Sequence, residues 1–124
     1  MGQYHILANL SNGEYVDPHS LGMGAKQYEH TLFKGDLAHA MYLLTMTSPY
    51  RGGGDWQGFE GISGRWAGDI VVILGDYTED SDIPEIPNLG SKYGWFCEFG
   101  TNISDKVGAA LEQVVERTKH WIVI

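Results

Sequence analysis

The sequence predicts a single α+β domain over residues 1–124, in which a four- to five-stranded, mainly antiparallel sheet packs against two or three helices. Three observations predict this fold class: an alternating apolar segment followed by a turn (4–16), a run of β-branched and leucine residues (69–77), and an apolar stripe at helical spacing (104–118). Because the strands alternate only partly with helices, an α+β fold is favoured over a doubly wound sheet. A chain of 124 residues is also one domain by length.

Residues 4–17 predict a β-hairpin. Apolar residues alternate there with other residues at the period of a strand: Tyr4, Ile6, Ala8 and Leu10. Asn12-Gly13 then supplies the positive φ of a type I′ turn, and residues 14–16 return as the second strand. Asp17-Pro18 closes the hairpin with a further turn.

Two helices are predicted before the glycine-rich stretch. Residues 24–33 predict a short one, and residues 35–47 a longer one. In the longer helix Asp36 is a natural N-cap, and Pro49 ends the pattern. Its apolar stripe consists of Leu37, Met41 and Leu44, with Ala40 beside them.

Two further strands are predicted in the second half of the chain. Residues 69–77 contain a continuous apolar run, which predicts a strand that is covered on both faces or lies centrally in the sheet. Residues 81–91 contain two prolines and predict a loop. Residues 92–100 alternate again, which predicts a strand with one side formed by Tyr93, Trp95, Cys97 and Phe99.

Residues 104–118 predict a helix. Ser104 can cap it, and Asp105 suits the positive end of the helix dipole. Its apolar stripe consists of Val107, Leu111, Val114 and Val115. Residues 120–124 predict a last strand; if this strand lies at the edge of the sheet, it invites a homodimer, and the alternative is an interior strand.

The chain carries a net charge of −8 at pH 7, and the acidic excess is concentrated in residues 76–105, where seven acidic residues stand against Lys92 alone. This balance predicts that the chain binds neither nucleic acid nor an anionic membrane, because phosphates would be repelled. The negative charge instead favours a partner with a basic surface. A single cysteine, the lack of a signal peptide and the lack of a long apolar run predict a soluble cytoplasmic protein.

Residues 50–69, YRGGGDWQGFEGISGRWAGD, form the most unusual segment, with seven glycines in twenty positions. They match neither a Walker loop nor a dinucleotide fingerprint, because the lysine of the first and the third glycine of the second are missing. Two copies of Arg-x-x-Gly-Asp remain, at 51–55 and 65–69. Their arginines can bind a carboxylate or phosphate bidentately, and the alternative is that each arginine pairs with a nearby aspartate.

Three consecutive glycines, Gly52–Gly54, predict either mobility or the close approach of a ligand or another backbone. The neighbouring aromatic residues Trp56 and Trp66 can anchor a partner at an interface, and the alternative is that they fold back onto the sheet. The acidic segment 76–85 predicts a solvated loop or a patch for a basic partner. The expected ligand- or partner-binding residues are Arg51, Gly53, Asp55, Trp56, Arg65, Trp66, Asp69, Asp76, Asp80 and Asp82.

No catalytic set, metal site or cofactor is predicted. None of the five histidines stands at metal-ligand spacing from another, and Asp80-x-Asp82 lacks the glycine and glutamate of a calcium loop. His39 is expected to be half-buried. Cys97 is expected to act as a small core residue, with nothing nearby to lower the pKa of its thiol.

The opening MGQY, the turn PHSLG and the run RGGGD, GRWAGD, GDY and TNISD resemble a family of small uncharacterised proteins of bacterial and phage genomes. The resemblance spans most of the chain and departs at Tyr50, where the family element reads GRGGGD. No activity or catalytic residue is carried over. The resemblance implies an accessory protein of a mobile element, including an inhibitor of host defence.

These observations leave two main hypotheses. The first is a non-catalytic binding protein that contacts a protein partner through the glycine-rich aromatic segment and the acidic segment. The alternative is a binder of an anionic small ligand, such as a nucleotide or sugar phosphate, or an enzyme acting on one, that uses Arg51 and Arg65.

Overall fold

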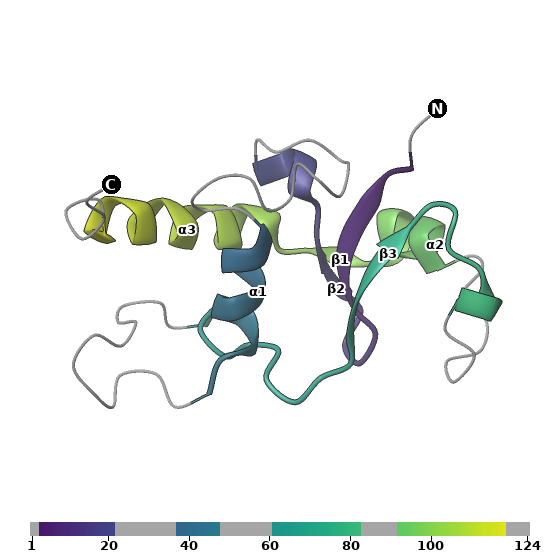
Figure 1. Ribbon diagram of the computed structural model, residues 1–124, viewed down its shortest axis with the longest axis horizontal. Helices are drawn as coiled ribbons and strands as arrows, with labels where there is room; N and C mark the ends of the chain where they lie inside the picture. Colours follow the sequence, from purple (N-terminus) through teal and green to yellow (C-terminus); the bar gives the residue numbers. More distant parts are fainter. Residues whose placement is uncertain (1–2, 22–36, 48–60, 83–91, 119–124) are drawn as a thin grey trace.

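The computed structural model describes residues 3–21, 37–47, 61–82 and 92–118, and it confirms the α+β class (Figure 1). A four-stranded sheet carries helices on both sides, as two hydrophobic core clusters on opposite faces of the sheet show. In chain order the elements are β1 (His5–Asn9), β2 (Glu14–Val16), η1 (Pro18–Leu21), α1 (Leu37–Thr45), β3 (Val71–Gly75), η3 (Asp80–Asp82), α2 (Lys92–Phe99), β4 (Thr101–Asn102) and α3 (Ser104–Thr118).

The sheet has the order β3-β1-β2-β4. β1 pairs antiparallel with both β2 and β3, whereas β2 and β4 pair parallel. The prediction for residues 69–77 was right about a strand and wrong about its place, because β3 lies at an edge of the described sheet and its Ile73 is exposed. β1 is the central strand and is buried along its whole length, since it has a neighbour on each side and a core on each face.

The two faces of β1 belong to different cores. Leu7 packs with α1 and α3 on one face, together with Ile62 and Trp66 from the segment before β3. Ile6 and Ala8 pack with Phe96 of α2 on the other face. Figure 1 shows the same division, with α1 and α3 toward one end of the molecule and α2 toward the other.

The β1–β2 hairpin is confirmed, but its turn differs from the expected type I′ turn at Asn12-Gly13. The register Leu7↔Val16 and Ala8↔Tyr15 centres the turn between Ser11 and Asn12. The Gly13 N–H donates to the Asn9 carbonyl at 3.0 Å, and Gly13 has a φ of 79°. The Asn9 side chain accepts the N–H groups of Ser11 and Asn12, so a side chain stabilises the wider turn.

Residues 92–100 are a helix, α2, and not the predicted strand. A short apolar run cannot be assigned by periodicity alone, and here the i, i+3 spacing decides: Phe96 is buried against the sheet and Tyr93 packs beside it. Trp95 and Phe99, four residues apart, lie on the exposed side. The helix ends at Phe99, and a Cβ added at the following Gly100 would lie 2.7 Å from the Phe96 carbonyl oxygen.

The predicted helices at 35–47 and 104–118 are confirmed as α1 and α3, each with a correction. In α1 the expected stripe residue Met41 is 36% exposed, and Leu43 is buried in its place. In α3 the Ser104 hydroxyl accepts the Asp17 N–H at 2.8 Å, while the Asn102 side chain accepts the Ser104 N–H. Ser104 therefore ties α3 to the end of β2, and the capping side chain is that of Asn102.

The confirmed part of the α3 stripe consists of Val107 and Leu111, both buried. The side chains of Val114 and Val115 are outside the described set. So are the predicted helix at 24–33, the cap Asp36, the stop at Pro49 and the predicted strand at 120–124.

Candidate functional site

The glycine-rich segment is described in its second half, residues 61–69. Its first half lies outside the part of the chain that the structure describes, and with it Arg51, Gly53, Asp55 and Trp56. These four residues remain predictions.

Residues 61–69 cover the C-terminal end of α1. The last carbonyl groups of a helix have no partner within the helix. Here the Gly64 N–H donates to the Leu43 carbonyl at 2.9 Å, and the Trp66 N–H donates to the Leu44 carbonyl at 2.8 Å. Gly64 has a φ of 71°, and an added Cβ would lie 2.9 Å from the Met46 carbonyl oxygen. The fold therefore requires a glycine at this position.

Arg65 is paired with Glu14 of β2, which lies 51 residues earlier in the chain, at the side of the sheet that faces α1. Its Nη2 donates to Glu14 Oε2 at 2.6 Å, and its Nε lies 3.0 Å from Oε1. Its Nη1 donates to the Gly61 carbonyl at 2.9 Å. Of the two alternatives for this arginine, the structure shows an internal ion pair, although its partner is a glutamate of the hairpin and not a nearby aspartate.

Trp66 is completely buried in the core between the sheet and α1. Its indole Nε1 donates to Glu14 Oε1 at 2.8 Å, so the polar edge of the buried ring is satisfied. Of the two alternatives for the aromatic residues, Trp66 follows the one in which the ring folds back onto the sheet. It presents no surface to a second molecule in this structure.

The Glu14 carboxylate accepts the hydrogen bonds of both Arg65 and Trp66. Its side chain is 10% exposed and also accepts the Asn12 Nδ2 group at 2.9 Å. The hydrogen bond from Arg65 lowers the pKa of Glu14 to about 2, against the opposing effect of burial and with further help from Trp66. The cluster of Glu14, Arg65 and Trp66, which we call the Glu14 clamp, holds residues 61–69 on the hairpin.

The other predicted residues of this half and of the acidic segment fall in separate places. Asp69 accepts the Asn9 Nδ2 group at 2.8 Å and so also joins the segment to the hairpin. Asp76 is exposed and accepts the Tyr4 N–H at 3.0 Å. Asp82 is exposed and accepts the Glu79 N–H at 2.9 Å in η3. Asp80 begins η3, and its side chain is outside the described set.

α2 exposes aromatic surface that the sequence pattern did not locate. Trp95 is 42% exposed and Phe99 is 66% exposed, with ring centroids 6.4 Å apart. Because the segment was predicted as a strand, both rings were placed on one face with Cys97. The i, i+4 spacing of the two rings is the signal that points to a shared helical side.

Cys97 is exposed and is therefore not the expected core residue. Partial desolvation, followed by the nearby charge of Asp17, raises the pKa of its thiol, while a hydrogen bond with Tyr93 opposes the rise. His39 is half-buried as expected, His19 is exposed and His5 is buried. Among residues 3–21, 37–47, 61–82 and 92–118, no group of three or more His, Cys, Asp and Glu side chains is placed to hold a metal ion.

The chain matches no protein-family model, no curated protein and no solved structure. Within the described segments no helix combines the length and the apolar character needed to cross a membrane.

Proposed function

We propose that the chain is a non-catalytic binding protein whose partner is a protein with a basic surface. The observation that carries the proposal is the set of exposed carboxylates that follows β3 at residues 76–82, together with the exposed Glu98 of α2. Figure 1 shows the backbone of η3 and of α2 toward the same end of the molecule. We call this surface the acidic end and define it by the exposed residues Asp76, Tyr77, Glu79, Asp82 and Glu98.

Charge and aromatic character both support this surface as the binding region. Tyr77 is 58% exposed beside Asp76, and aromatic side chains often contribute most of the binding energy at interfaces. Lys92 is the only basic residue between positions 76 and 105, so the net charge of this region is strongly negative. Such a surface steers a positively charged partner and speeds its association.

The geometry favours this surface over the glycine-rich segment. Trp66 is buried and Arg65 is held by Glu14, so both act within the fold. The same observation weighs against the alternative of an anionic ligand on Arg51 and Arg65, because Glu14 already occupies the Nε and Nη2 donors of Arg65. Because of the resemblance to phage and bacterial proteins, we further propose that the chain inhibits a host defence protein.

A capture experiment with charge variants tests the proposal. The variant Asp76→Asn/Glu79→Gln/Asp82→Asn removes three charges and keeps the oxygen atoms that accept the N–H groups of Tyr4 and Glu79. The matched control, Asp105→Asn/Glu112→Gln/Glu116→Gln, removes three exposed charges from α3. We expect wild type and control to capture the same basic protein from a bacterial lysate, with a signal that falls as salt is raised.

The acidic-end variant should no longer capture that protein. Capture of nothing above background, or equal capture by the acidic-end variant, contradicts the proposal. Circular dichroism of each variant excludes misfolding as the cause.

A further inference from the structure

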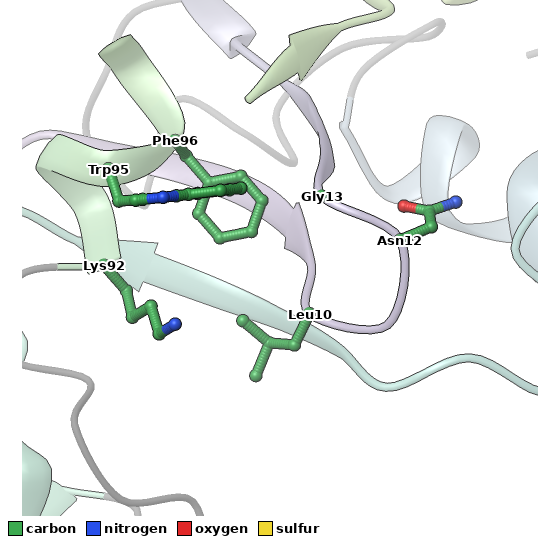
Figure 2. Close-up of a pocket in the computed structure, with 6 residues that line it drawn as sticks. All are labelled: Leu10, Asn12, Gly13, Lys92, Trp95 and Phe96. Carbon is green, nitrogen blue, oxygen red and sulfur yellow. The ribbon is translucent and has the colours of Figure 1, made fainter. Parts of the chain in front are cut away.

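A hollow of about 220 Å³ lies between the β1–β2 turn and α2 (Figure 2). It is lined by Leu10, Asn12, Gly13, Lys92, Trp95 and Phe96. None of these residues is among those that define the acidic end or the Glu14 clamp, and the hollow adjoins the clamp through Asn12, which is hydrogen-bonded to Glu14.

The walls of the hollow are mostly flat and apolar. The rings of Trp95 and Phe96 meet edge to face, with centroids 5.0 Å apart and an interplanar angle of 86°. Trp95 lies against the turn, since a Cβ added at Gly13 would be 3.4 Å from its Cη2 atom. Leu10 forms the opposite wall (Figure 2). Such walls favour a planar apolar ligand, because aromatic rings stack on indole and phenyl surfaces.

Two polar side chains line the hollow, those of Asn12 and Lys92, and they differ in their hydrogen-bond and ion-pair partners. The Asn12 Nδ2 group donates to Glu14 Oε1, and Asn12 Oδ1 accepts the backbone N–H of Glu14. Both ends of this amide are therefore engaged by Glu14. Lys92 has its Nζ atom 5.8 Å from the centroid of the Trp95 ring. No carboxylate in the described part of the chain forms an ion pair with Lys92. The ammonium group is thus the charged group that a ligand in the hollow can meet.

We propose that this hollow binds a small planar aromatic carboxylate, whose ring lies against Trp95 and whose carboxylate pairs with the ammonium group of Lys92. The volume sets the size of the ligand, because it falls below the roughly 300–1,000 Å³ of pockets that hold drug-sized molecules. One or two fused rings are therefore the upper limit. Lys92 is also the first residue of α2, so the positive end of the helix dipole adds to the attraction for a carboxylate.

Three probes of one shape test the proposal: naphthalene-2-carboxylate, the neutral naphthalene-2-carboxamide and the cationic naphthalen-2-ylmethylammonium. Each is titrated into the full-length protein, and the indole N–H resonance of Trp95 is followed by NMR after assignment with Trp95→Phe. We expect the carboxylate to bind up to about fivefold more tightly than the amide, which is the contribution of a partly exposed ion pair. The cation should bind most weakly.

Two lysine variants separate the specific contact from overall charge. Lys92→Met should reduce the affinity for the carboxylate to that of the amide and leave the amide unchanged. Lys106→Met removes an exposed lysine of α3 and should change neither affinity.

The proposal is overturned if no probe shifts the Trp95 resonance up to its solubility limit, or if carboxylate and amide bind wild type equally. It is also overturned if Lys92→Met and Lys106→Met weaken the carboxylate to the same extent. None of these results bears on the capture experiment, because the acidic-end variant leaves Lys92 and Trp95 intact.

Discussion

Replacing Glu14 by glutamine is expected to destabilise the fold through the Glu14 clamp. Glutamine has the same shape but brings an N–H₂ group to the side of the carboxylate where Arg65 donates. The guanidinium and the indole of Trp66 then compete for one remaining oxygen. The cost is that of a broken charge-assisted pair whose carboxylate is largely buried and whose guanidinium is partly exposed.

The magnitude follows from the pKa of Glu14, which is lowered from 4.5 to about 2. Each unit corresponds to about 1.4 kcal/mol, so the carboxylate contributes about 3 kcal/mol to the free energy of unfolding near neutral pH. Solvent reaches Arg65, which is 32% exposed, and this screening lowers the expected loss to about 2–3 kcal/mol.

The pH dependence has a definite sign. Because the pKa of Glu14 is lower in the folded state, its contribution is complete above the unfolded value of 4.5 and is lost as pH falls toward about 2. The difference in free energy of unfolding between wild type and Glu14→Gln should therefore be largest at neutral pH and shrink as the pH falls below 4.5.

Urea denaturation of both proteins between neutral pH and pH 3 measures this difference. Glu79→Gln, which neutralises an exposed glutamate, is the matched control and should differ little from wild type. Equal stability of Glu14→Gln and wild type at neutral pH, or a difference that does not change with pH, would contradict this role of Glu14.

Two further predictions concern the backbone of residues 61–69 and the α2 helix. Gly64→Ala should cost more stability than Gly68→Ala in urea denaturation: both positions have positive φ, but only the Cβ at Gly64 approaches backbone, 2.9 Å from an oxygen. Left-handed strain alone costs about 1 kcal/mol, so equal losses would contradict the role of Gly64 at the end of α1. Burial, with smaller contributions from nearby charges, raises the pKa of Tyr93 to about 12, so its ionisation by ultraviolet absorbance should come well above pH 10. The contribution of Tyr93 to the free energy of unfolding should be complete below pH 10 and be lost as pH rises toward 12. If wild type and Tyr93→Phe differ in this free energy by a constant amount across the range, the prediction is wrong.

Local signals in the sequence determined the elements whose patterns are strong. The alternation and turn residues of 4–16 gave a hairpin, and the 3.6-residue period of 104–118 gave a helix, because each pattern arises within one element. The same reasoning failed at 92–100, where a short apolar run satisfies both periods. The apolar run of residues 69–77 also predicted a strand that is covered on both faces or central, whereas β3 lies at an edge, because such a run does not specify how many neighbouring strands there will be.

Composition and local pattern are enough to predict an α+β domain with a strongly acidic stretch and a glycine-rich segment of unusual composition. The contacts of Arg65 and Trp66 with Glu14, a residue about fifty positions earlier in the chain, are visible in the folded chain alone. The same is true of the hollow that Trp95 and Lys92 form with the β1–β2 turn. The physical reason is that periodicity and turn chemistry act between near neighbours, whereas these contacts arise from packing two elements on one sheet, which no local pattern records.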